Sequence, residues 1–202
     1  MRLKHIFTLI LLPVLLFGSG AVEQFIDYGL NTIPFSPVVG DIDNDGWPEI
    51  VISSRSTGSI TSTSSDGRVR AIRVEEDSTV TTLWNRSYGR ACWTPFLADV
   101  DGDGIGEVYL NVLFHSGGNM GVVCLDGPTG DIIWQTDLGG SPYTAVAGHE
   151  LVLADYTGDG RIEVITQQNY SSSDYNIIIL DALSGAEIFR IPVDKRAYAS
   201  PV

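Results

Sequence analysis

The sequence predicts an all-β fold made of short antiparallel strands that repeat along the chain, and three observations point to it. Glycine is frequent, at 22 of the 202 residues, as expected where many short strands are joined by tight turns. β-Branched and aromatic residues gather in short runs between turn signals, and no segment has the apolar period of an amphipathic helix. One acidic pattern then recurs three times at a nearly constant step, which indicates a repeat architecture.

The repeated pattern is an acidic loop followed by a β-branched run. It reads GDIDNDGWPEIVIS over 40–53, ADVDGDGIGEVYLN over 98–111 and ADYTGDGRIEVITQ over 154–167. Its first Asp falls at 41, 99 and 155, so the steps are 58 and 56 residues. A turn and two further strands follow each run. About four strands in each repeat is typical of one blade of a β-propeller, whereas a β-sandwich would not repeat its sequence at a fixed step.

We therefore expect residues 22–202 to form about three four-stranded blades, in repeats of about 36–93, 94–150 and 151–199. The sequence ASPV at 199–202 matches FSPV at 35–38, which precedes the first acidic loop. A fourth repeat is thus expected to begin at about residue 200. The chain is expected to be a fragment of a larger propeller, because three blades cannot close a ring and would leave open sheet edges.

Residues 1–21 are expected to be a secretory signal peptide. Arg2 and Lys4 precede an apolar run over 6–17, and small residues at 19–21 allow cleavage after Ala21. The run is short for a membrane span, and no second apolar run of spanning length follows, so the product is expected to be extracellular or periplasmic. Removing the two basic residues changes the formal net charge from −13 to −15. A chain this acidic is not expected to bind nucleic acid, whose phosphates have the same sign.

The acidic loops have the chemistry of calcium sites. Relative to the first Asp, oxygen-bearing side chains fall at offsets 0, 2, 4 and 8, and a Gly at offset 5 allows a sharp turn. A main-chain carbonyl at offset 6 can add another oxygen. Hard oxygen ligands at this density favour Ca²⁺ over the stricter octahedral Mg²⁺, and no His or Cys favours Zn²⁺. The predicted metal ligands are Asp41, Asp43, Asp45, Trp47 and Glu49; Asp99, Asp101, Asp103, Ile105 and Glu107; and Asp155, Thr157, Asp159, Arg161 and Glu163.

Two alternatives compete with this loop type. An EF-hand needs a Glu at its twelfth position and flanking helices, but the twelfth positions here are Ile52, Leu110 and Thr166. A solvated Asp-Gly turn without a metal is the simpler alternative, and three loops with one spacing make it less attractive. We expect the third loop to bind most weakly, because Thr157 replaces a carboxylate.

These loops resemble the FG-GAP repeats, also called integrin α-like or VCBS repeats, whose blades carry a D-x-D-x-D-G-x-x-[DE] calcium loop. The resemblance extends from Ser36 to the end and implies a propeller, usually of seven blades, that serves as an extracellular binding or adhesion scaffold. The segment LDGPTGDIIW over 125–134 also resembles a quinoprotein-type blade, and 180–189 is a looser copy. That resemblance implies architecture and not a quinone cofactor.

The favoured function is therefore a secreted calcium-binding scaffold with an extracellular protein or glycan ligand, not an enzyme by itself. His115 and His149 lie in no nucleophile, zinc or phosphate motif, so no catalytic group of residues is predicted. The alternatives are the propeller portion of a larger secreted enzyme, such as a polysaccharide lyase or a quinoprotein-like dehydrogenase, and a purely structural surface domain.

Five further side chains carry expectations about packing. Trp84, Trp134 and Phe189 recur at one position of the repeat and are expected in the core. Cys92 and Cys124 are the only cysteines, and export would permit a disulfide between them. Two buried free thiols on separate strands are the alternative, and the sequence leaves both open.

Overall fold

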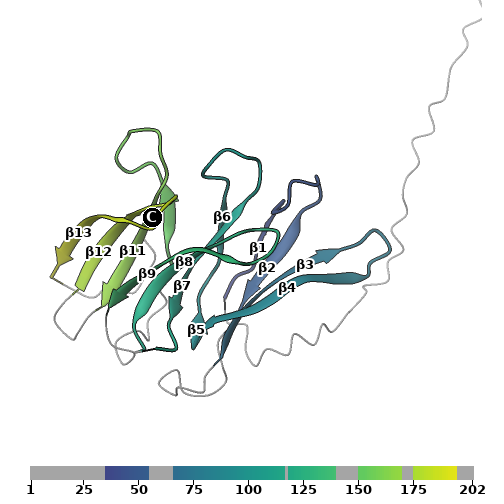
Figure 1. The fold of residues 1–202 in the computed structure, drawn as a ribbon, viewed down its shortest axis with the longest axis horizontal. Helices are drawn as coiled ribbons and strands as arrows, with labels where there is room; N and C mark the ends of the chain where they lie inside the picture. Colours follow the sequence, from purple (N-terminus) through teal and green to yellow (C-terminus); the bar gives the residue numbers. More distant parts are fainter. Residues whose placement is uncertain (1–34, 55–65, 117, 140–149, 170–174, 195–202) are drawn as a thin grey trace, which may run out of the picture.

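The computed structural model of the chain describes residues 35–54, 66–116, 118–139, 150–169 and 175–194 (Figure 1). Over these residues the chain forms three antiparallel sheets and no helix, which confirms the all-β prediction. Among them there is accordingly no helix long and apolar enough to cross a membrane. The predicted signal peptide and the expected start of a fourth repeat lie outside the described residues.

Each sheet contains one acidic loop and the strands that follow it. The first sheet has the order β1-β2-β3-β4, the third has the order β10-β11-β12-β13, and the second has the order β5-β7-β8-β9 with β6 also paired to β7. The strands of the first sheet are β1 (Val38–Gly40), β2 (Glu49–Ser53), β3 (Gly67–Val74) and β4 (Val80–Gly89). Those of the second are β5 (Ala91–Cys92), β6 (Phe96–Ala98), β7 (Glu107–Leu113), β8 (Met120–Leu125) and β9 (Ile132–Gly139). Those of the third are β10 (Val152–Ala154), β11 (Glu163–Asn169), β12 (Tyr175–Asp181) and β13 (Glu187–Val193).

The three sheets have the same register and the same irregularity. Ile50 pairs with Ile72, Val108 with Leu125, and Val164 with Leu180, at equal distances from the three acidic loops. The next strand pair is shifted just before Ile72, Leu125 and Leu180. A bulge of this kind bends a strand and increases its twist. The sequence repeat is therefore also a repeat of strand geometry.

The core lies between neighbouring sheets. One buried cluster joins the first and second sheets and includes Val69 and Leu110, and another joins the second and third sheets and includes Val122 and Ile178. Figure 1 shows the sheets side by side in chain order. Each internal sheet face is therefore covered by the adjacent repeat, as in repeat proteins generally.

A tryptophan on the fourth strand fastens one sheet to the next. Trp84 Nε1 donates a hydrogen bond to the Gly127 carbonyl at 2.7 Å, and Trp134 Nε1 donates to the Ala182 carbonyl at 2.9 Å. Both indoles are at most 9% exposed, so the prediction that they are core residues is confirmed. Phe189 occupies the same register position, yet it is 48% exposed. The prediction of a core position is wrong for Phe189 within the described residues, because no later sheet covers it there.

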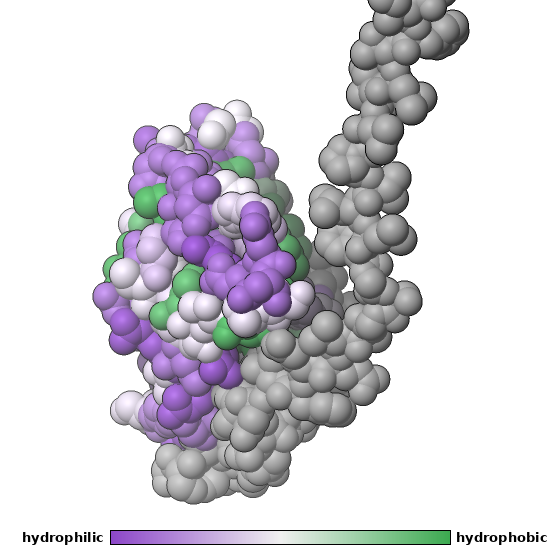
Figure 2. Space-filling model, turned by 90° about the vertical axis from the view of Figure 1, so that its right-hand side faces the viewer, coloured by the Kyte–Doolittle hydropathy of each residue, from purple (hydrophilic) through white to green (hydrophobic). Residues whose placement is uncertain are grey.

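One side of the molecule has a mainly polar surface. Figure 2 shows the side of the molecule that faces right in Figure 1, and its surface is largely hydrophilic with separate small hydrophobic areas. Ile188 and Ile191 of β13 are also exposed. β13 therefore carries several of the exposed apolar side chains, and others lie on β1 and β9, including Val39, Ile132 and Ile133.

Both cysteines are buried free thiols, one in each of the two large core clusters. Burial raises the pKa of the Cys92 thiol and of the Cys124 thiol to about 12 each. The structure thus favours the free-thiol alternative that the sequence left open.

Candidate cation sites in three equivalent loops

The three acidic loops occupy the same place in each sheet. They connect β1 to β2, β6 to β7 and β10 to β11, and they lie along the edge of the molecule that is uppermost in Figure 1. In each case the residue before the first Asp pairs directly with the Glu at offset 8: Gly40 with Glu49, Ala98 with Glu107, and Ala154 with Glu163. This pairing brings the Glu at offset 8, the last carboxylate of each loop, close to the first Asp.

The first Asp closes each loop by accepting a backbone hydrogen bond from the Gly at offset 5. The distances are 2.9 Å from Gly46 to Asp41, 3.0 Å from Gly104 to Asp99 and 3.0 Å from Gly160 to Asp155. These three glycines have φ between 86° and 89°, the left-handed region that favours glycine. The sequence argument for a sharp turn at this position is therefore confirmed.

The Glu at offset 8 is buried in every loop. Glu49, Glu107 and Glu163 are 0%, 6% and 2% exposed. Each accepts a backbone hydrogen bond from the residue after the first Asp, at 3.1, 3.0 and 2.7 Å. Burial, opposed by the hydrogen bond from Val100 and helped by the charge of Asp101, raises the pKa of Glu107. A nearby cation stabilises the charged form of a carboxylate that is buried in this way.

Each loop brings three carboxylates together so that one oxygen from each lies within 4.8 Å of the others, a grouping that could hold a metal ion. The groups are Asp41, Asp43 and Asp45; Asp99, Asp101 and Glu107; and Asp155, Asp159 and Glu163. All nine residues were predicted as ligands. The first group differs from the others in that its buried Glu is not a member.

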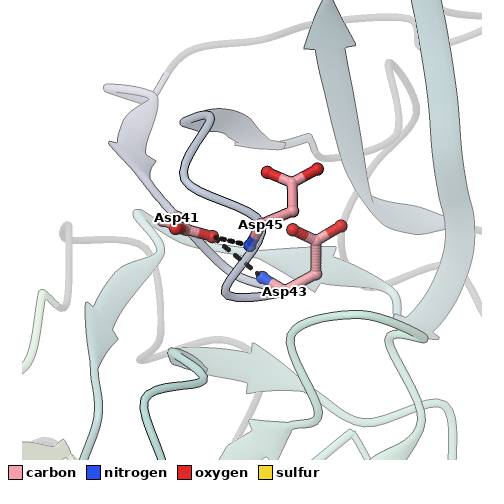
Figure 3. A group of neighbouring side chains, drawn as sticks. All are labelled: Asp41, Asp43 and Asp45. Atoms are coloured by element: carbon pink, nitrogen blue, oxygen red, sulfur yellow. Dashed lines mark hydrogen bonds between the residues drawn. The ribbon is translucent and has the colours of Figure 1, made fainter.

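Figure 3 shows how the first loop arranges its aspartates. The Asp41 carboxylate points at the loop backbone and accepts hydrogen bonds from the N–H groups of Asp43 and Asp45, at 3.4 and 3.2 Å. The carboxylates of Asp43 and Asp45 project together from the same side of the loop. Desolvation acts to raise the pKa of Asp41, but hydrogen bonds from Gly46 and other loop N–H groups hold it below its usual range.

The remaining predicted ligands play structural parts in the described contacts. The residue at offset 6 donates its N–H to the Asp at offset 4: Trp47 to Asp45 at 2.8 Å, Ile105 to Asp103 at 2.7 Å and Arg161 to Asp159 at 2.9 Å. Their carbonyl oxygens as ligands stay a prediction. Thr157 donates from its N–H and its hydroxyl to the Glu163 carboxylate, at 3.1 and 3.3 Å.

Sequence reasoning missed Arg73, a residue of β3 that contacts the first loop. Its guanidinium contacts Asp43 at 2.7 Å, Asp45 at 2.9 Å and Glu49 at 2.8 Å. The hydrogen bonds that Arg73 donates to Glu49 and Asp43 raise the pKa of Arg73, so this side chain stays positively charged. Aligning the third strand of each repeat would have shown a basic residue in the first where the other two have Asp.

Comparison with known proteins shows structural similarity at the level of the fold. No family model matches the chain, and no curated protein is significantly similar to it. The structure is similar to the exotype rhamnogalacturonan lyase YesX, with 17% identity, a TM-score of 0.55, and coverage of 77% of this chain and 32% of that one. It is also similar to the rhamnogalacturonan lyase YesW, with 18% identity, a TM-score of 0.57, and coverage of 80% of this chain and 34% of that one. The Bacillus licheniformis rhamnogalacturonan lyase PL11 has 18% identity and a TM-score of 0.57, with coverage of 82% of this chain and 35% of that one.

The chain shares its fold with part of these lyases. It spans about a third of the length of each. At 17–18% identity this likeness concerns the fold alone, and the resemblance to FG-GAP repeats stays a prediction.

Proposed function

We propose that this chain is a secreted, calcium-binding repeat scaffold whose sheets are blades of a β-propeller and which binds an extracellular protein or glycan. The observation that carries the proposal is the shared geometry of three loops that lie 58 and 56 residues apart in sequence. Each has its glycine hydrogen bond to the first Asp, its buried Glu and its group of three carboxylates. A solvated turn would need neither a buried Glu nor converging carboxylates.

Calcium is the cation that best suits these loops. Three carboxylate groups whose oxygens lie within 4.8 Å repel one another. A divalent cation bound among them attracts all three and offsets that repulsion. Ca²⁺ accepts several carboxylate and carbonyl oxygens in flexible geometry, whereas Mg²⁺ prefers to keep its water ligands. The propeller part of the proposal is supported by the side-by-side sheets, the repeated bulge and the two tryptophan contacts between sheets.

The first experiment measures the thermal midpoint of the purified chain in chelator, in Ca²⁺ and in Mg²⁺. Ligand that binds only the folded state stabilises it by about 2.7 kcal/mol at 100 times its dissociation constant. We expect Ca²⁺ to raise the midpoint by several degrees and Mg²⁺ to raise it less. Glu107→Gln should reduce the calcium shift, whereas Glu76→Gln, which alters an exposed Glu outside the loops, should not. An equal midpoint in chelator and Ca²⁺ contradicts the proposal.

A second candidate function is the propeller portion of a secreted polysaccharide lyase. The specific observation in its favour is the fold shared with three rhamnogalacturonan lyases. The test is incubation of the protein with rhamnogalacturonan, with the unsaturated product of elimination followed by its ultraviolet absorbance. Product formation that is absent from a heat-inactivated sample supports the lyase. Binding of the polysaccharide without product supports the scaffold.

A further inference from the structure

The first acidic loop differs from the other two in that an arginine of β3 forms ion pairs with its carboxylates. The Arg73 guanidinium lies 2.7–2.9 Å from carboxylate oxygens of Asp43, Asp45 and Glu49. The Arg73 side chain is 20% exposed and that of Glu49 is fully buried. One planar group with several N–H donors thus contacts three of the four carboxylates that the sequence assigns to calcium, with Nε at Glu49 and Nη2 at Asp43 and Asp45.

The register of the sheets shows that this contact is particular to the first repeat. Ile72, Leu125 and Leu180 are equivalent, so the residues that follow them, Arg73, Asp126 and Asp181, are equivalent as well. Asp181 pairs directly with Glu163, the buried Glu of the third loop. The second and third loops therefore have an Asp next to the buried Glu, where the first loop has an arginine.

Asp126 and Asp181 each form hydrogen bonds within the turn that follows in their own repeat. Asp126 accepts the Thr129 N–H at 3.0 Å, and Asp181 accepts the Ser184 N–H at 2.8 Å, so each caps the turn that follows its strand. Neither supplies a positive charge to its acidic loop. Among the described residues no arginine or lysine forms an ion pair with a carboxylate of the second or third loop. Arg161 of the third loop donates its backbone N–H to Asp159 but forms no ion pair there.

The buried Glu of the first loop also has a partner that its counterparts lack among the described contacts. Glu49 Oε1 accepts the Arg73 hydrogen bond and Oε2 accepts the Ile42 N–H, at 2.8 and 3.1 Å. Glu107 and Glu163 belong to the carboxylate groups of their loops, whereas the group of the first loop consists of the three aspartates. Arg73 thus occupies Oε1 of Glu49, an oxygen of a residue that the sequence assigns to calcium.

We propose that Arg73 acts as a built-in counter-ion that closes the first loop to calcium, so that the chain binds Ca²⁺ at the second and third loops only. A divalent cation in the first loop would have to displace the guanidinium from three carboxylates or sit beside its positive charge. This inference rests on the proposed calcium function. It reverses the expectation from the sequence that the third loop binds most weakly.

The decisive experiment counts bound Ca²⁺ per chain by equilibrium dialysis of metal-free protein. We expect two for the wild type and three for Arg73→Gln, because that variant frees the carboxylates, including Asp43 Oδ1, which is buried and accepts no hydrogen bond among the described residues. Arg73→Lys, which keeps the charge, should still bind two. Arg68→Gln is the matched control, because it removes the same charge from β3 at a residue paired with Asp66, and it should bind two.

A second measurement assigns the additional ion to the first loop. Asp43→Asn should leave two ions bound in the wild-type background and should remove the third ion from Arg73→Gln. In chelator Arg73→Gln should have a lower thermal midpoint than the wild type, since Glu49 is then buried without its partner, and Ca²⁺ should restore it. This measurement is informative even if the variant is only partly folded without calcium.

The outcomes separate this inference from the proposal on which it rests. Three ions in the wild type, or only two in a folded Arg73→Gln, would overturn the inference and leave calcium binding intact. No bound calcium in any of the proteins would overturn the proposed function itself.

Discussion

Trp134 and Phe189 occupy the same position in successive repeats, and truncating each to alanine should have very different effects on stability. Trp134 is 9% exposed, donates a hydrogen bond to the Ala182 carbonyl and packs against Tyr109 with ring centroids 6.0 Å apart. Phe189 is 48% exposed. Both changes remove an aromatic ring from the fourth strand of a sheet, so the comparison isolates the contact with the next sheet.

The magnitude follows from these contacts. Replacing a buried Trp by Ala typically costs about 3–5 kcal/mol of the free energy of unfolding. The lost hydrogen bond accounts for about 1 kcal/mol, and the aromatic pair with Tyr109 for about 0.5–1.5 kcal/mol. For Phe189 we expect about 1 kcal/mol, since full burial of a Phe is worth about 1.5–3 kcal/mol and roughly half of this side chain is exposed.

The assay is thermal unfolding of the purified protein in calcium buffer, followed by circular dichroism. A difference of about 3 kcal/mol corresponds to about 6–12 °C in the midpoint for a chain of this size. Trp134→Phe should fall between the wild type and Trp134→Ala, because it loses the hydrogen bond but keeps an aromatic ring. Equal losses for Trp134→Ala and Phe189→Ala would refute the reasoning that Trp134 fastens the second sheet to the third.

Two further predictions test the core. Cys92 and Cys124, whose pKa burial raises to about 12, should not react with a thiol reagent at about pH 8 in the native chain, because the thiolate is scarce below the pKa. Two thiols per chain should react after denaturation, and fewer than two would reveal a disulfide. Gly185 has φ +70°, and an added Cβ would meet the Trp134 ring, whereas Gly158 has φ +75° and open space around it. Gly185→Ala should therefore destabilise by at least about 2 kcal/mol and Gly158→Ala by about 1 kcal/mol, and equal losses in chemical denaturation would contradict the clash.

The acidic loops could be predicted from the sequence because their contacts are local. The hydrogen bonds from Gly46 to Asp41 and from Ile42 to Glu49 span five and seven residues. A short segment that contains its own donors, acceptors and glycine adopts its turn with little help from the rest of the fold. For the same reason the spacing of the sequence is enough to identify all nine residues of the carboxylate groups.

The repeat step likewise determined the all-β class and the four-strand content of the first and third sheets, whereas the second sheet has five strands. It did not determine which strands join across repeats. β5 follows the first sheet in sequence, but Cys92 pairs with Val112 of β7 in the second. The sequence pattern does not distinguish pairing of β5 with the first sheet from pairing with the second. The packing of one sheet against the next decides between these two pairings.

The sequence by itself determined that this chain is an all-β repeat protein with three acidic loops, and only the tertiary structure decided which loops keep their negative charge and which aromatic side chains are covered. Arg73 lies 24 residues from Glu49 and 30 from Asp43 along the chain. It meets both because β2 and β3 pair in one particular register. Phe189 is exposed and Trp134 is buried because a sheet follows one of them and not the other within the described residues. Local hydrogen bonds can be read from spacing, whereas contacts between distant strands depend on register and packing, to which many parts of the chain contribute at once.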